Sequence, residues 1–562
     1  MASLSKSRLL FGFTSPRTIE KIIPEIQLLC DNFEDKVWDN KNQISFYNML
    51  THSSFFEGGS VQKIKDGMAA RDRINRAPKA LGFVELSPTI KLTEAGKYLL
   101  SGKRTEEVIT RQLLKFQLPS PNHTQSKDLN FQYNIKPYLE LFRLIYDLGG
   151  ITKTEIATFF LQMIDYNKYE SIKEQILSYR EKCKANKGKV NRATFLYHVQ
   201  KDVILNTWEP SELKIREGND NSLDKKIKTK ISNLMDYADA MFRYIRATGL
   251  ISLEKRSYRI IISPTRIDDV KYILENIPRE PYKYQSNNEF FKYLYSATNI
   301  KLLSDDKEKI KGQLKKFGVG IKTNTENVED LKDLLSNTYT KIKENKEKEI
   351  TIKLQQYEEF SDIIETFDKI KSKDIIDPAL MLEYNSWRAM TMIDHAQTIR
   401  GNFNTDIDFM PLSTAGGNKS DIEILYKDFG LIVEVTTATG SKQYEMEGEP
   451  VARHYGRAKE KIHPNMYCLF IATNLNSDCV GYMFNTNRMN TKAYGGKTKI
   501  IPLSTDDFKT FLLTAKEHRI KDEKAIKNWL EKLWEKGQDP NIDEEEWRGY
   551  IKSSLTNWSR AI

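Results

Sequence analysis

The stretch SDIEILYKDFGLIVEVTT, Ser420 to Thr437, decides the fold of the carboxy-terminal part of this chain. Two apolar runs flank the tight turn KDFG, which predicts an antiparallel pair of buried strands. Asp421 and Glu434 lie within this pair, and an unpaired carboxylate is among the costliest groups to bury. Three interpretations are open at this point: a solvated strand end, a structural salt bridge, or a divalent-metal site.

The sequence around this pair predicts an α/β domain with a mixed sheet. A helix that carries Glu383 near its start follows Pro378, and the irregular segment 401–420 leads into the two strands. After them we expect a loop containing Lys442 and Glu447, and then a helix that Pro450 opens at its first turn. Strands over 466–473 and 499–504 and a helix over 506–518 complete the pattern.

The amino-terminal half contains a weak internal repeat of helix, hairpin and helix. It covers residues 71–102 and again 237–276, where Gly249 ends the first helix of the second copy. Between the copies, residues 138–160 read as a helix, a Gly-Gly turn and a helix, with Thr152 or Thr154 as the cap. These patterns predict tandem winged-helix domains that recognise DNA.

Basic residues gather in both copies and are the predicted DNA contacts. A solvated helix face is the alternative explanation for any one of them. The predicted contacts are Arg71, Arg73, Arg76 and Lys79 in the first copy, and Lys225, Lys226, Lys228 and Lys230 ahead of the second.

Residues 281–375 change to alternating Lys and Glu with a thin apolar stripe, which is typical of a helical linker. The expected domains are therefore 1–125 and 126–280 for recognition, 281–375 as linker and 376–562 for catalysis. The expected fold is multidomain α+β.

Composition narrows the class of protein. The 562 residues carry 87 Lys and Arg against 77 Asp and Glu, a net charge of +10 that is compatible with a polyanionic partner. No apolar run is long enough for a membrane span, and no secretory signal is evident, so we expect a cytoplasmic protein. The four cysteines have no metal-binding spacing, which argues against zinc. The GGKT at 495–498 lacks the first glycine of a phosphate loop and precedes a strand, which argues against ATP.

Carboxylates on a strand pair and a neighbouring helix suit Mg²⁺, which takes hard oxygen ligands and often only one or two carboxylates. An Asp and a Glu twelve residues apart are a weak signal alone. Basic modules upstream make a phosphodiester the natural substrate for such a metal.

At these residues the chain resembles a known family. The arrangement Asp421, twelve residues, Glu434-Val435-Thr436 resembles the PD-(D/E)xK nuclease core, and residues 420–455, with the string EMEGEPVARHY, look like the cleavage domain of the AlwI-type family. That family contains type IIS restriction and site-specific nicking endonucleases. The likeness extends to SPRTIEKIIPEI, RDRINRAPKALGFV, LTEAGKYL and KIREGNDNSLDKKIKTK.

The resemblance implies a Mg²⁺-dependent endonuclease that reads a short asymmetric site in double-stranded DNA and cuts a few base pairs away. It implies catalytic roles for Glu383, Asp421, Glu434 and Glu447, with Asp421 and Glu434 as metal ligands. Thr436 occupies the usual lysine position, so that role passes to Glu447, to Lys442 or to a second metal. Arg453 and His454 could touch the scissile phosphate, but a position on the helix surface is the interpretation we favour for each.

Two questions stay open in the sequence. One active site would nick a single strand, whereas a double-strand cut needs a second catalytic subunit or a transient dimer. The alternative function is a winged-helix DNA-binding regulator whose carboxylates are structural.

Overall fold

The computed structural model describes residues 2–4, 8–53, 55–56, 68–186, 190–215, 220–254, 259–321, 327–393, 396–416, 419–518 and 523–558. The described residues up to Thr338 form one compact unit, unit 1, and those from Tyr339 onward form another, unit 2. Helix α15 (Val328–Gln355) begins in unit 1 and ends in unit 2. The four-domain division stays a prediction. None of the described helices is long and apolar enough to cross a membrane.

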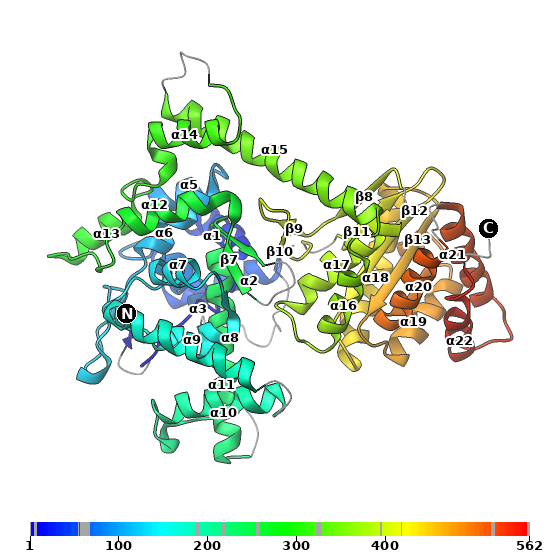
Figure 1. Ribbon diagram of the computed structural model, residues 1–562, viewed down its shortest axis with the longest axis horizontal. Helices are drawn as coiled ribbons and strands as arrows, with labels where there is room; N and C mark the ends of the chain where they lie inside the picture. The colour runs from blue at the N-terminus through cyan, green and yellow to red at the C-terminus, as the bar shows by residue number, and fades with distance from the viewer. Residues whose placement is uncertain are drawn as a thin grey trace. The chain divides into compact units, whose positions relative to one another are not determined.

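Unit 1 is mostly helical (Figure 1). Its first copy of the repeat runs through α3 (Met68–Asn75), α4 (Ala77–Ala80), β2 (Val84–Glu85), β3 (Lys91–Leu92) and α5 (Glu94–Leu100). The predicted cap is confirmed, because the Thr93 side chain accepts a hydrogen bond from the Gly96 N–H. α1 (Ile19–Phe33) packs on α5 and buries Ile19, Ile22, Ile26 and Leu29.

The second copy is α11 (Leu223–Arg246), β6 (Ile251–Leu253), β7 (Arg259–Ile262) and α12 (Ile267–Asn276). Gly249, at φ 67°, follows α11 in the left-handed region that glycine tolerates. Upstream lie α7 (Pro137–Asp147), β5 (Ile151–Thr152) and α8 (Lys153–Thr158), and Thr152 caps α8. β5 joins β7 and β6 in a three-stranded antiparallel sheet, so residues a hundred positions apart share it. α9 (Tyr169–Ala185) and α10 (Arg192–Leu205) lie between α8 and α11 in the chain.

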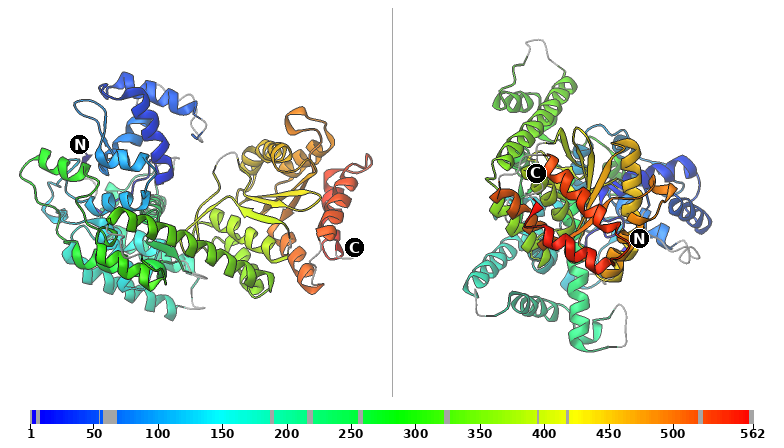
Figure 2. Two further views of the ribbon diagram at one scale, coloured as in Figure 1. Left: turned by 90° about the horizontal axis from the view of Figure 1, so that it is seen from above. Right: turned by 90° about the vertical axis from the view of Figure 1, so that its right-hand side faces the viewer.

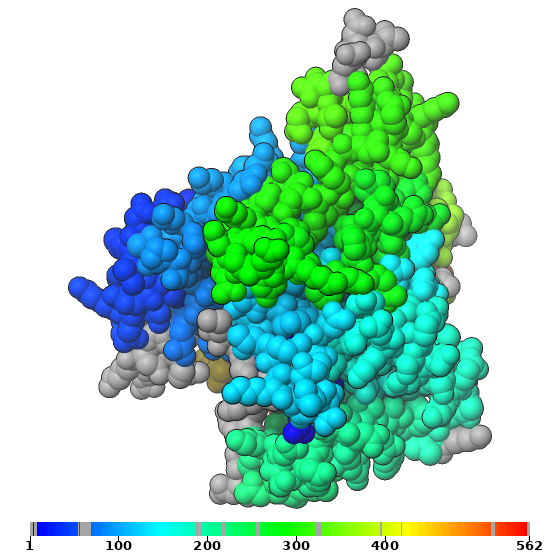
Figure 3. Space-filling model, turned by 90° about the vertical axis from the view of Figure 1, so that its left-hand side faces the viewer, coloured from blue at the N-terminus to red at the C-terminus, as the bar shows by residue number. Residues whose placement is uncertain are grey.

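The remaining helices of unit 1 are α2 (Asn40–Thr51), α6 (Thr105–Lys115), α13 (Asn287–Tyr295) and α14 (Lys307–Lys316). α13 packs against α5, although almost two hundred residues separate them in the chain. In Figure 3 the green segment around α13 accordingly lies beside the blue amino-terminal part. Two short strands, β1 (Ala2–Ser3) and β4 (His123–Thr124), pair in parallel.

Unit 2 is built on a mixed five-stranded sheet in the order β14-β13-β12-β11-β8. The strands are β8 (Thr398–Gly401), β11 (Ile422–Leu425), β12 (Gly430–Thr436), β13 (Met466–Ala472) and β14 (Ile500–Ser504). β8, β11 and β12 are antiparallel neighbours, whereas β12, β13 and β14 are parallel. The predicted mixed α+β class is confirmed.

Helices cover both faces of this sheet (Figure 2). α17 (Pro378–Ile393) and α20 (Thr505–Glu517) pack on one face, and α16 (Phe360–Lys371) packs on α17. α18 (Ser441–Lys461) and α19 (Ser477–Arg488) pack on the other. α21 (Glu523–Gly537) and α22 (Glu544–Ser554) are the last two helices of the unit in chain order.

Two predictions about unit 2 were wrong. α18 starts at Ser441 and contains Pro450 in its interior, so Glu447 lies on the helix and not in a loop ahead of it. The segment 401–420 is also not wholly irregular. It contains β9 (Asn404–Thr405) and β10 (Pro411–Ser413), which pair with each other, and it begins at the end of β8.

Candidate active site

The β11–β12 pair brings Asp421 and Glu434 together. Ile422 pairs with Val433, so Asp421, one residue earlier, lies opposite Glu434. Because side chains alternate between faces, Ile422, Ile424 and Val433 point into the core that α17 and α20 cover. The two carboxylates therefore share the opposite face, where α18 packs on β12 and β13.

Asp421 is held at both its main chain and its carboxylate. The Val435 N–H donates to its Oδ2 at 2.7 Å, and the Asn402 N–H donates to its carbonyl at 2.8 Å. Burial raises the pKa of Asp421 well above its ordinary value, and the charges of Glu434 and Glu447 raise it further. The strand pair thus fixes this carboxylate in a place that disfavours its charge.

Glu434 is bonded to His454 of α18. The distance from His454 Nδ1 to Glu434 Oε1 is 3.0 Å, and both side chains are largely buried. With Glu434 ionised, Nδ1–H is the donor. Burial raises the pKa of Glu434, as do the charges of Glu447, Glu383 and Glu423. Burial lowers the pKa of His454, and the nearby Arg453 and Arg457 lower it further. The interpretation of His454 as a helix-surface residue was therefore wrong.

Glu447 reaches the same place from α18, two turns before His454. Burial raises the pKa of Glu447, while a hydrogen bond with the Thr436 side chain and the charge of His454 lower it. Thr436, in the predicted lysine position, is itself buried and accepts from the Ala438 N–H at 3.0 Å. Thr436 therefore orients a carboxylate at the position where the general motif supplies a charge.

Glu383 enters from α17. The Ala415 N–H donates to its Oε2 at 2.9 Å. Burial raises the pKa of Glu383 to about 9, with the charge of Asp421 as the second cause. The four predicted catalytic carboxylates are thus coupled to one another at one end of the β11–β12 pair.

This site suits a hard divalent cation better than a soft one. Glu383 and Glu434 are buried, and Asp421 and Glu447 are half-buried. The raised pKa values of all four show that their ionised forms are disfavoured here, and a bound cation would relieve that penalty. The described residues contain no group of three or more His, Cys, Asp or Glu side chains placed to hold a metal ion on their own. Mg²⁺ commonly takes one or two carboxylates and fills its shell with water and phosphate. Asp421 and Glu434, directly opposed, fit that demand.

The predicted DNA contacts of the first repeat differ in their surroundings. Arg71 is exposed, and Arg76 pairs with Asp72 at 2.8 Å. Arg73 instead forms a two-bonded ion pair with Glu25, whose side chain is only 1% exposed. Lys79 is half-buried, and burial lowers its pKa. Arg73 thus has a structural partner that the sequence did not reveal.

In the second group, Lys225 is exposed and Lys226 half-buried on the first turn of α11. Lys228 pairs with Asp224 at 2.6 Å. Lys230 lies 3.7 Å from the centroid of the Trp208 ring, and burial lowers its pKa. DNA contact by these residues stays a prediction.

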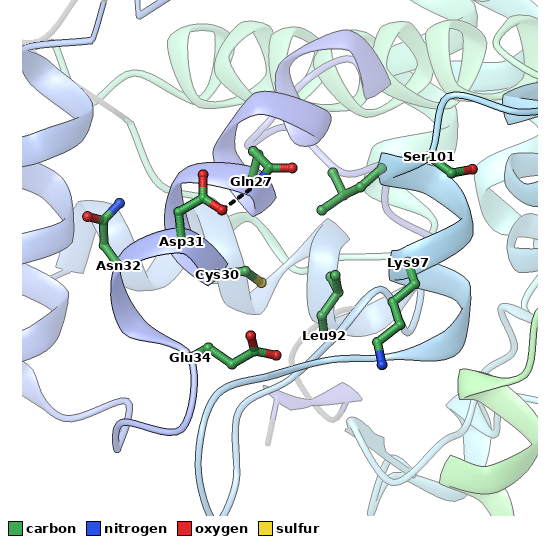
Figure 4. A pocket seen from close by; sticks show the side chains of 9 residues that line it. Gln27, Cys30, Asp31, Asn32, Glu34, Leu92, Lys97 and Ser101 are labelled. Atoms are coloured by element: carbon green, nitrogen blue, oxygen red, sulfur yellow. Dashed lines mark hydrogen bonds between the residues drawn. The ribbon is translucent and has the colours of Figure 1, made fainter.

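A cavity of about 640 Å³ lies in unit 1 between α1 and α5 (Figure 4). Asp31, Glu34 and Lys97 line it together with Cys30. Burial raises the pKa of the Cys30 thiol to about 12, so it is not a nucleophile at neutral pH. This cavity is remote in sequence from the four carboxylates and offers no comparable set of groups.

Comparison with known proteins agrees with the resemblance. A family model described as AlwI restriction endonuclease matches residues 79–511, about three quarters of the chain and all four carboxylates. The chain belongs to the AlwI restriction endonuclease family. It is accordingly a DNA endonuclease. No curated protein sequence matches it.

Two solved structures are similar to parts of the endonuclease. The small subunit (R.BspD6I2) of the heterodimeric restriction endonuclease R.BspD6I is 23% identical and covers 35% of this chain and 99% of its own, with a TM-score of 0.30. The BpuJ1 endonuclease binding domain, in a complex with pyrene- and phenanthrene-modified DNA, is 13% identical. It covers 50% of this chain and 93% of its own, also with a TM-score of 0.30.

Proposed function

We propose that this AlwI-family endonuclease is a type IIS-like enzyme that binds a short asymmetric DNA site through unit 1. It hydrolyses a phosphodiester a few base pairs away in unit 2, with Mg²⁺. The observation that carries the proposal is a set of four carboxylates that influence one another: Glu383 on α17, Asp421 just before β11, Glu434 on β12 and Glu447 on α18. A structural role alone does not account for four buried or half-buried acids with raised pKa values, because each destabilises the fold when ionised.

The order of elements supports a winged-helix interpretation of unit 1. A winged helix has the element order found here in α7, β5, α8, α11, β6 and β7. β5 joins the β6–β7 hairpin in one sheet, as this fold requires. Helices α9 and α10 are then an insertion between α8 and α11. In that arrangement α11 would enter the major groove. Its first turns carry Lys225, Lys226 and Lys228, which would contact phosphates.

In unit 2, the opposed Asp421 and Glu434 with Thr436 two residues on are consistent with a PD-(D/E)xK core. Asp421 and Glu434 would hold the cation, and the Val435 N–H and His454 would keep their carboxylates aimed. Glu447 and Glu383 would orient the attacking water, and a bound cation, which favours the ionised form of nearby carboxylates, would let either of them accept its proton. When bound, Mg²⁺ supplies Lewis acidity to the scissile phosphate and offsets charge on the leaving oxygen.

One chain carries one such carboxylate set within the described residues, so we propose that a single copy nicks one strand. A double-strand break would then need a second catalytic domain, from a dimer or from a separate subunit.

The test is to incubate supercoiled plasmid with the protein, with and without Mg²⁺, beside Asp421→Ala. Open circles alone mean a nick through one site, and linear product means that a second site is recruited. Asp421→Ala should abolish cutting and retain site-specific binding. Binding without any Mg²⁺-dependent cutting, across plasmids rich in different short sites, would favour the regulator and contradict the proposal.

A further inference from the structure

The edge strand β8 places an arginine beside the carboxylates. Arg400 pairs with Glu423 across β8 and β11, and the Asn402 N–H donates to the Asp421 carbonyl. Asn402 is thus the neighbour of Asp421, and Arg400, two residues away, is its diagonal neighbour. Diagonal neighbours in antiparallel strands lie roughly 7–8 Å apart, which is within reach of a long side chain.

Arg400 and Asp421 share one face of the sheet. Ile399, Ile422 and Ile424 pack into the core on the α17 side. Because side chains alternate along a strand, Arg400, Asp421 and Glu423 point to the other face. There α18 packs on β12 and β13, and α19 packs on β14. Arg400 and Thr398 of β8 are exposed, so this edge of the face is open to a ligand.

Among the described residues, the guanidinium of Arg400 has no partner. Within the described parts of the chain it makes no ion pair or side-chain hydrogen bond, although Glu423 lies directly opposite. Glu423 instead accepts from the Asn402 side chain at 3.0 Å. An exposed arginine beside an acidic centre, with its nearest carboxylate already bonded elsewhere, is available to an anion.

We infer that Arg400 binds a phosphate of the DNA strand being cut, next to the scissile one, and positions that strand over Asp421 and Glu434. This inference rests on the proposed nuclease function. An acidic centre repels a polyanion, so a cation is needed beside it, and Thr436 supplies no charge. The planar guanidinium suits two phosphate oxygens at once, which a lysine ammonium does not match.

The experiment compares the full-length protein with Arg400→Ala and Arg400→Lys, and uses Lys427→Ala as control. Lys427 is also an exposed cation and lies in the turn at the far end of β11. Single-turnover cleavage is measured on duplexes that carry one methylphosphonate, a neutral phosphate, at each position flanking the cut.

Arg400→Ala should cut roughly 10- to 100-fold more slowly, the scale of one lost charge-assisted contact, with Arg400→Lys in between and Lys427→Ala unchanged. One flanking methylphosphonate should slow the wild type and not slow Arg400→Ala further, because the same contact is already lost. Affinity for the recognition site and the rise in Tm with Mg²⁺ should not change, which separates this role from metal binding.

Two results overturn the inference. Arg400→Ala could cut at the wild-type rate, or every flanking methylphosphonate could slow it as much as it slows the wild type. In both cases the proposed nuclease function stands. A wild type that cuts no duplex with Mg²⁺ present contradicts the proposed function itself, and the inference falls with it.

Discussion

The Thr436 side chain is hydrogen-bonded to the Glu447 carboxylate and links the end of β12 to α18. The residue that we propose to stand where the general nuclease motif has a lysine is thus part of the acidic site itself. A buried threonine can orient a carboxylate, but it cannot neutralise one. The positive charge that the site needs must come from metal ions or from side chains on other strands.

Thr436→Val should therefore impair cleavage while keeping the shape of the side chain. Loss of a hydrogen bond to a charged group predicts a rate roughly 10-fold lower in single-turnover cleavage. Thr436→Ser retains the hydroxyl and should stay near the wild-type rate. Equal activity of the valine and serine variants would show that the hydroxyl does not matter.

A second prediction concerns the pH dependence of stability without metal. The pKa of Glu383 is raised from 4.5 to about 9 by burial and by Asp421. The folded state therefore holds a proton that the unfolded state has released, and stability from this group is lost as pH rises from about 4.5 to about 9. Glu383→Gln keeps an acceptor for the Ala415 N–H and removes this loss.

The Tm of Glu383→Gln should consequently rise relative to that of the wild type as the pH increases from about 4.5 to about 9. Calorimetry in EDTA measures both Tm values. Each kcal/mol corresponds to about 2–4 °C for a unit of this size. The control is Asp428→Asn, which replaces an exposed carboxylate in the β11–β12 turn. The difference in Tm between this variant and the wild type should show no such trend. A difference that is flat in pH would mean that Glu383 is not held protonated.

A third prediction separates fold from DNA contact in unit 1. Arg73 is paired with the buried Glu25, so Arg73→Ala leaves a carboxylate buried without its partner and should cost about 3–5 kcal/mol of stability. Arg71 lies two residues before Arg73 in the sequence, but its side chain is exposed. Arg71→Ala should leave Tm unchanged, weaken DNA binding and lower its salt dependence by about one charge.

Denaturant unfolding and binding titrations at several salt concentrations check both variants. Glu25→Gln combined with Arg73→Met should recover stability that Arg73→Ala loses, because no charge is then left buried. If Arg73→Ala is as stable as the wild type, the ion pair with Glu25 does not stabilise the fold, and Arg73 is again a predicted DNA contact.

Strand pairing in unit 2 was predictable because a tight turn between apolar runs fixes both strands and their register. The start of α18 was not, because Pro450 is typical of a first helical turn. Inside α18 its missing N–H leaves the Met446 carbonyl unpaired within the helix, and Met446 is exposed enough for water to satisfy it. A helix that begins before Glu447 puts Glu447 and His454, two turns apart, on one face.

The role of β8 was equally hidden, because its residues TIRG have no strong strand signal and their partner lies over twenty residues away. Arg73 shows the same limit in unit 1. A basic run on a helix predicts a DNA contact. Only the structure shows that Arg73, one residue of this run, forms an ion pair with Glu25 of α1.

The fourth prediction tests His454 as a positioning residue for Glu434. His454 Nδ1 lies 3.0 Å from Glu434 Oε1, and a partner of a metal-binding carboxylate typically contributes 10- to 100-fold to metal affinity. His454→Ala should therefore weaken Mg²⁺ binding to the metal-free protein by roughly that factor in calorimetric titration. His454→Asn offers an amide donor near the place of Nδ1 and should recover part of the loss.

The matched control is His463→Ala, since His463 is half-buried just beyond α18 and its ring contacts the Asn465 main chain instead of a carboxylate. It should bind Mg²⁺ as the wild type does. A purely structural role for His454 would lower Tm and leave Mg²⁺ affinity intact. A positioning role shifts the Mg²⁺ concentration needed for half-maximal cleavage, and high Mg²⁺ restores much of the rate. Wild-type Mg²⁺ affinity in His454→Ala would remove His454 from the site.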